Sequence, residues 1–361
     1  MPGRKQAWRV QGWPRLGLLL FVGAGSLGFL AGGWLALRWA QPQTLNSNSE
    51  WVATTDEQED QAEVASPLIY NVRTAPPTVY NPDLQAVVQQ MVAWVQARGL
   101  PTAALSITLM DVSRPETPQI AGYQQQELRY PASVVKLFWL VMFLAYQQAG
   151  LLTGEAVPIA ELTAMMQLSS NDAASRVVDA LTGTESGKAL GPAEFAQWKQ
   201  KREQINHFFR GAGYGYLNLM HKNFPIYGYE EPWGREWQLR GGDQQPSRNR
   251  LTTWQTARLL YEIYTLQAVS PTASQKIQDW ITRTSPLPGF LGANLPPDAQ
   301  VLGKEGHTST CRHDGVIIRR SDGRMAFILV VFGDDPAYSA DEEFLPELAR
   351  RSWQALNRLY P

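Results

Sequence analysis

Ser133 and Lys136 are the two residues whose types and spacing first indicate chemistry. They lie three positions apart, so a helix would place both on one face. A serine hydroxyl is a weak nucleophile until a base takes its proton, and a lysine in apolar surroundings can be that base because burial lowers its pKa. The six residues after Lys136 are apolar, which predicts that the lysine is buried. A capping serine beside a snorkelling lysine is the alternative interpretation.

Two further polar motifs lie downstream. Ser169-Ser-Asn171 separates two patterns of helical periodicity, and a helix cap is predicted at Asn171 or Asp172. In one interpretation the motif only caps the helix. In the other, its serine relays protons and its asparagine amide binds a substrate carbonyl. Lys304-Glu-Gly306 ends a predicted strand at 299–306.

The order and setting of these three motifs resemble those of the class A β-lactamases and penicillin-binding proteins, which are serine hydrolases. The segments 130–137, 159–174 and 251–257 are also similar to that family, and the resemblance covers roughly residues 84–361. It implies that Ser133 is the acylated nucleophile, that Lys136 is its activating base and that Ser169 passes a proton to the leaving amine.

The resemblance also implies how the substrate is bound. Asn171 would hold the amide side chain of the substrate, and Lys304 would attract its carboxylate. The oxyanion hole would combine the N–H of Ser133 with an N–H of the strand after Gly306, near Thr308.

Three features depart from the family pattern. The interval between the first two motifs is shorter than in typical members, which implies a more open cleft. Glu305 replaces a hydroxyl residue and would repel an anionic substrate unless it points away or pairs with Lys304 or His307. The Glu-x-x-Leu-Asn pattern that supplies the deacylating base is absent, and Glu230 and Glu231 are the candidates for that base, with solvated loop carboxylates as the alternative.

The N-terminal region predicts a location. Residues 16–37 carry no charge and are long enough to cross a bilayer as a helix. The four basic residues before this run and the six acidic residues after it predict, by the positive-inside rule, a cytoplasmic tail at 1–15 and a single-pass signal anchor at 16–38. A flexible acidic linker at 39–82 and a hydrolase domain at 83–361 would lie outside the cytoplasmic membrane, in the periplasm. A cleaved signal peptide is the alternative.

The remaining patterns predict the fold class and the partners. Strands at both ends of the domain with helices between them indicate an α+β fold, with an antiparallel sheet of about five strands flanked by a mainly helical subdomain. A net charge of −1 gives no nucleic-acid signature, and the single cysteine, Cys311, excludes an intrachain disulfide. His307 and His313 flank Cys311 at a spacing that fits no standard zinc pattern, so we expect neither metal nor cofactor. We expect the catalytic domain to be monomeric.

These observations support three hypotheses. The first is a membrane-anchored serine hydrolase of class A β-lactamase type that opens β-lactams. The second is a penicillin-binding-protein-like D-alanyl peptidase or transpeptidase that acts on peptidoglycan peptides. The third is a catalytically inactive wall-binding relative, which Glu305 and the missing base would favour.

Overall fold

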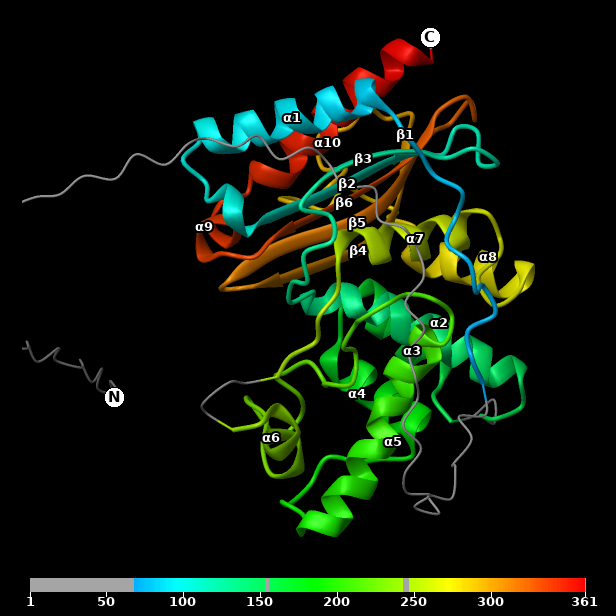
Figure 1. Cartoon of the computed structure of the whole chain (residues 1–361), viewed down its shortest axis with the longest axis vertical. Coiled ribbons are helices and arrows are strands. Elements are labelled where there is room, and N and C mark those ends of the chain that lie inside the picture. The colour runs from blue at the N-terminus through cyan, green and yellow to red at the C-terminus, as the bar shows by residue number, and fades with distance from the viewer. Residues whose placement is uncertain (1–67, 153–155, 243–246, 361) are drawn as a thin grey trace, which may run out of the picture. The chain divides into compact units, whose positions relative to one another are not determined.

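The central element of the fold is a six-stranded sheet with the strand order β1-β3-β2-β6-β5-β4. The computed structural model describes residues 68–152, 156–242 and 247–360 (Figure 1). The strands are β1 (Val79–Tyr80), β2 (Leu105–Asp111), β3 (Gln119–Tyr123), β4 (Ala299–Thr308), β5 (Cys311–Arg320) and β6 (Ala326–Gly333). The helices are α1 (Pro82–Ala97), α2 (Lys136–Gln148), α3 (Ile159–Gln167), α4 (Asn171–Thr182), α5 (Pro192–Arg210), α6 (Arg235–Arg240), α7 (Thr253–Tyr264), α8 (Pro271–Ile281), α9 (Pro336–Ala340) and α10 (Phe344–Leu359), with 3₁₀ turns η1 (Thr102–Ala104) and η2 (Ala132–Val135).

The α+β class is confirmed, but the prediction of a purely antiparallel sheet is wrong. Strand β1 pairs with β3 in parallel, with Val79 opposite Gln119, whereas the other neighbouring strands are antiparallel. A strand of two residues is too short to show the alternation on which strand prediction rests. It forms because the chain runs along the edge of β3 on its way into α1.

Two helical layers cover the sheet (Figure 1). On one face, α1 and α10 bury an apolar core that includes Leu84, Val88, Leu348 and Leu356. On the other face, α7 packs on β2, β5 and β6 and connects the sheet to the lobe formed by α2 to α6. This second face carries the larger core, and the helix that follows Ser133 lies within it.

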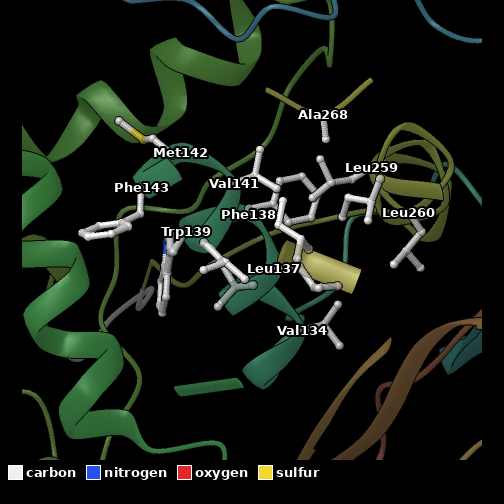
Figure 2. Close-up of a cluster of buried hydrophobic side chains, with 14 of the residues drawn as sticks. Val134, Leu137, Phe138, Trp139, Val141, Met142, Phe143, Leu259, Leu260 and Ala268 are labelled. Carbon is white, nitrogen blue, oxygen red and sulfur yellow. The ribbon is translucent and has the colours of Figure 1, made fainter. Parts of the chain in front are cut away.

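Helix α2 is buried on all sides. Every residue from Leu137 to Tyr146 is buried, as expected for a helix that is apolar around its whole circumference. Figure 2 shows Phe138 near Leu259 and Leu260 of α7, with Trp139, Met142 and Phe143 on the opposite side of α2. The Trp139 indole N–H also donates a hydrogen bond of 2.9 Å to the carbonyl of Leu219. The turn η2, directly before α2, is therefore attached to a helix that packs into the core on all sides.

The predicted membrane anchor at 16–38 lies outside the described residues. No helix in the described ranges is long and apolar enough to cross a bilayer. The described chain begins at Leu68, and Tyr70 is fully buried against Phe208 and Phe209 of α5.

Candidate active site

Ser133 lies in the 3₁₀ turn η2, and the regular helix begins three residues later at Lys136. The residue before it, Ala132, has a φ of +46°, which a non-glycine residue rarely adopts. The carbonyl of Ala132 accepts a hydrogen bond of 3.2 Å from the side-chain amide of Asn223. Ser133 itself is partly exposed, whereas its neighbours Ala132 and Val134 are buried. Backbone strain of this kind is typical of functional sites, and here it presents one serine at the surface of a packed core.

Lys136 is fully buried, as predicted. Its ammonium group donates to the carbonyl oxygen of Ser169 at 2.6 Å and to the side-chain oxygen of Asn171 at 2.8 Å. The hydroxyl of Ser169 lies 3.4 Å from the same nitrogen. The structure thus brings the first two sequence motifs together around one amine.

The surroundings of Lys136 lower the pKa of its side chain from 10.5 to about 7. Burial is the largest cause, because a charged amine loses its hydration inside the protein. The positive charge of Lys304 lowers this pKa further, and the carboxylate of Glu305 opposes the shift. A substantial fraction of Lys136 is therefore a neutral amine near pH 7, which is the form that accepts a proton.

In the loop at 169–171, Ser170 has a structural role, whereas Ser169 and Asn171 contact Lys136. Ser170 caps α4, since its hydroxyl accepts a hydrogen bond of 3.2 Å from the N–H of Ala173. The prediction that Asn171 or Asp172 is the cap is therefore wrong by one or two positions. Ser169 has a φ of +54°, and this backbone conformation places its carbonyl and its hydroxyl beside Lys136.

Lys304 reaches the same loop from β4. Its buried ammonium group donates a hydrogen bond of 3.0 Å to the hydroxyl of Ser169, so this hydroxyl lies between the two lysines. Lys304 also forms an ion pair and a hydrogen bond with the neighbouring carboxylate of Glu305. Burial lowers the pKa of Lys304, and the charge of Glu305 opposes this shift. Of the orientations open to Glu305, the structure has the one that pairs with Lys304.

At Gly306, β4 lies against η2, the turn that holds Ser133. A Cβ atom at this position would lie 2.7 Å from the carbonyl oxygen of Pro131 and 3.1 Å from the backbone nitrogen of Ser133. Only glycine fits without displacing one of the two backbones. Thr308, named with the oxyanion hole, is the last residue of β4, two positions beyond this approach. The backbone nitrogen of Ser133 thus lies beside β4 at Gly306, and an oxyanion hole formed with an N–H farther along this strand stays a prediction.

Glu230 and Glu231 lie on an exposed loop beside the site. Both line a pocket of about 360 Å³ together with Tyr130 and Thr308. The side chain of Glu231 is 82% exposed and lies 3.7 Å from the guanidinium group of Arg240. Among the interactions of the described residues, neither carboxylate is bonded to Ser133 or Lys136, so the role of deacylating base stays a prediction.

Asn223 is a site residue that the sequence did not reveal. Its side chain supports the carbonyl of Ala132, and its own side-chain oxygen accepts a hydrogen bond of 3.5 Å from Asn249. It lies in the irregular stretch between α5 and α6, where no periodic pattern marks one polar residue above another. Only its contact with the strained nucleophile turn identifies it.

A family model and several solved structures match this chain. The model of the beta-lactamase enzyme family matches residues 150–356, which is more than half of the chain. The matched span includes Ser169, Asn171 and Lys304 and begins after Ser133 and Lys136. No protein among the curated sequences matches the chain.

Three solved structures share the fold. The first is a beta-lactamase from Sphaerobacter thermophilus, with a TM-score of 0.55 and 15% identity over 76% of this chain and 99% of that one. The second is the ancestral class A beta-lactamase of the last common ancestor of Gram-negative bacteria, with a TM-score of 0.53 and 19% identity over 74% and 99%. The third is a point mutant of PBP-A as an acyl-enzyme complex with penicillin G, with a TM-score of 0.53 and 16% identity over 78% and 99%. At these identities the similarity shows a common fold.

Proposed function

The chain belongs to the beta-lactamase enzyme family and is a β-lactamase-like serine hydrolase, and from this premise we propose that it hydrolyses β-lactam amide bonds through an acyl-enzyme on Ser133. One observation carries the proposal. The buried amine of Lys136 contacts Ser169 and Asn171, and the hydroxyl of Ser169 contacts Lys304, so all three motifs meet at the base of the turn that holds Ser133. The acyl-enzyme complex of PBP-A with penicillin G supports a β-lactam as the substrate class.

We infer the following sequence of steps. Neutral Lys136 takes the proton of the Ser133 hydroxyl, and the serine oxygen attacks the carbonyl carbon of the lactam. The resulting oxyanion is stabilised by the N–H of Ser133 and by an N–H of β4 after Gly306. The C–N bond then breaks, and the hydroxyl of Ser169 passes a proton to the leaving nitrogen while Lys304 attracts the substrate carboxylate.

A second candidate function is that of a D-alanyl peptidase or transpeptidase acting on peptidoglycan peptides. It is favoured by the exposure of Glu230 and Glu231. An enzyme that removes the penicilloyl group from its serine only slowly needs no carboxylate base close to that serine. In that case the penicilloyl adduct on Ser133 persists.

Time-resolved mass spectrometry of the full-length protein with penicillin G separates these functions. An adduct that forms on the wild type and disappears within minutes, together with free penicilloate, supports the β-lactamase. A stable adduct supports the peptidase instead. The Ser133→Ala variant should form no adduct, whereas the control Ser321→Ala, in the exposed turn after β5, should behave like the wild type. A folded wild-type protein without any adduct would overturn both functions.

We also propose that residues 16–38 anchor the protein in the cytoplasmic membrane and that residues 83–361 act in the periplasm. The support is the uncharged run of 16–37 and the opposite charge of its two flanks. Membrane fractionation tests this. The full chain should sediment with membranes and a chain lacking residues 1–38 should be released. A full chain in the soluble fraction would contradict the anchor.

A further inference from the structure

The pocket beside Ser133 differs from the catalytic cluster in its charge pattern. It has a volume of about 360 Å³ and extends from Tyr130, three residues before the nucleophile, to Thr308 at the end of β4. Two of its lining residues, Lys222 and Glu236, already form hydrogen-bonded ion pairs with Asp179 and Arg202. Four further charged side chains of both signs line it, and the steps of acylation use none of them: Glu230, Glu231, Arg240 and Arg248.

The direction of β4 indicates which part of a substrate reaches this pocket. In the described sheet β4 is an outermost strand, and Lys304, Gly306 and Thr308 follow one another along it. At about 3.3 Å per residue, Lys304 and Thr308 are about 13 Å apart along the strand. A substrate that adds to this edge, with its carboxylate at Lys304 and its scissile carbonyl near Gly306, extends its acyl group toward Thr308. The pocket therefore lies on the acyl side of the scissile bond.

Two arginines supply positive charge to the pocket. The guanidinium group of Arg248 lies 5.0 Å from the centroid of the Tyr130 ring. Burial lowers the pKa of Arg240, and the positive charge of the nearby Arg248 lowers it further. A carboxylate between these two groups would relieve their repulsion and accept charge-assisted hydrogen bonds.

The loop that carries Glu230 and Glu231 supplies negative charge to the same pocket. The carboxylate of Glu231 is 3.7 Å from Arg240, which is an ion pair without a direct hydrogen bond. Both carboxylates are exposed, so a ligand ammonium group can reach them without displacing core residues. An uncharged acyl group leaves these charges without a new partner, whereas a group with both charges matches them.

We propose that this pocket is a specificity subsite for an amino-acid zwitterion, a group with one carboxylate and one ammonium, on the acyl side of the scissile amide. Arg240 and Arg248 bind its carboxylate, and Glu230 and Glu231 bind its ammonium group. The inference rests on the proposed function, because it specifies the substrate of the same acyl transfer. Acylation of Ser133 does not itself require a charged acyl group, so the subsite specifies a substrate class beyond the proposed reaction.

Four penicillins with the same nucleus test the subsite. Penicillin G has an uncharged side chain, ampicillin an ammonium group, carbenicillin a carboxylate, and penicillin N a zwitterionic aminoadipoyl group. Because charge-assisted hydrogen bonds to both ends of the zwitterion favour its binding, we expect the second-order acylation rate of penicillin N to exceed that of penicillin G about tenfold or more. Equal rates, or a faster reaction of penicillin G, would overturn the subsite and leave the proposed function intact. No acylation by any of the four would overturn the proposed function and the subsite with it.

Charge-removing variants assign the two halves of the subsite. Arg240→Gln should reduce the ratio of penicillin N to penicillin G rates about tenfold, and Glu231→Gln should reduce the ratio of ampicillin to penicillin G. The control Arg319→Gln, an arginine of β5 whose guanidinium donates to Gln300, should leave both ratios unchanged. If Arg240→Gln slows all four penicillins by the same factor, the arginine has a structural role and the subsite is refuted. A slower loss of every adduct in Glu231→Gln, with unchanged acylation ratios, would refute its ammonium half and identify a deacylating base instead.

Discussion

Two clusters of charged residues, each with buried cations, differ in their balance of charge: one lies in the helical lobe and the other at the border of this lobe with the sheet. The paired cluster consists of Asp179, Arg202, Lys222 and Glu236, with two cations and two carboxylates. Arg202 bonds to Glu236 at 2.7 Å, and Lys222 bonds to Asp179 at 2.6 Å. The cation-rich cluster consists of Lys136, Lys304 and Glu305, with two cations and one carboxylate.

We infer from this difference that the paired cluster stabilises the fold and that the cation-rich cluster serves the proposed acylation. In the paired cluster each charge has an opposite partner, and the ion pairs connect α4, α5 and α6. In the cation-rich cluster the carboxylate pairs with Lys304, so Lys136 contacts only neutral oxygens and faces a like charge. Removing a residue should therefore cost stability in the first cluster and activity in the second.

Lys136→Met should have the largest effect on activity. Without the amine no base takes the proton of Ser133, and loss of a general base costs about 10²–10⁴-fold in rate. The free energy of unfolding should change by less than about 2 kcal/mol, because the lost hydrogen bonds are offset by the loss of a desolvated charge. Stopped-flow acylation and urea unfolding measure the two quantities. Acylation within tenfold of the wild type would remove Lys136 from the mechanism.

Arg202→Met should have the opposite profile. It leaves the buried carboxylate of Glu236 without its closest cation, which typically costs about 3–5 kcal/mol of stability. The acylation rate of the folded fraction should stay within about threefold of the wild type, because Arg202 contacts none of the three motifs. The midpoint of urea unfolding, with activity measured below the transition, tests both statements. Stability equal to the wild type would mean that the paired cluster does not hold the lobe together.

The same contrast explains how much the sequence could predict. The cation-rich cluster belongs to short motifs, and residue type, spacing and an apolar run were enough to predict that Lys136 is buried. The turn between β5 and β6 is of the same local kind, since a Ser-Asp-Gly sequence separates two apolar strands and Gly323 has a positive φ of 75°. Local chemistry determines these features, so a local pattern reveals them.

The remaining features depend on contacts between distant segments. The paired cluster joins Asp179 to Lys222 and Glu236 across an irregular stretch, and no periodicity indicates which of its charges are buried. The support of Ala132 by Asn223 and the parallel edge strand β1 have the same origin. Tertiary packing selects these residues from many equivalent polar ones, and a single sequence does not record that selection.

The pH dependence of acylation should follow the cation-rich cluster. Because the pKa of Lys136 is about 7, the rate should rise with pH through 7 and level off above 8, with about a fivefold drop from pH 7 to pH 6. Glu305→Gln removes the charge that raises this pKa, so the rising limb should move to lower pH. Pre-steady-state acylation between pH 5 and 9 measures the limb. A pH-independent rate would contradict a titrating lysine base.

The lowered pKa of Lys136 should also make the free energy of unfolding depend on pH. The folded-state pKa of Lys136 is lowered from 10.5, so between about pH 7 and 10.5 the unfolded chain binds more protons than the folded protein. The contribution of this group to stability therefore increases as pH rises through that window. The slope of unfolding free energy against pH should be smaller in Lys136→Met than in the wild type. Identical slopes would indicate that the amine is not desolvated in the folded state.

Of the substitutions Lys136→Met, Arg202→Met and Glu305→Thr, the last should have the smallest effect in free energy, and it should increase activity. In the wild type the carboxylate of Glu305 pairs with Lys304 and competes with the carboxylate of an incoming substrate. A threonine removes this competitor and supplies a hydroxyl that can donate to the substrate, so penicillin G acylation should accelerate by about tenfold, as expected for one charge-assisted hydrogen bond. Glu305→Gln, which removes the charge without supplying a hydroxyl, separates the two contributions. If both variants acylate more slowly than the wild type, Glu305 holds Lys304 in its functional position, and the cation-rich cluster needs its one carboxylate as much as the paired cluster needs its two.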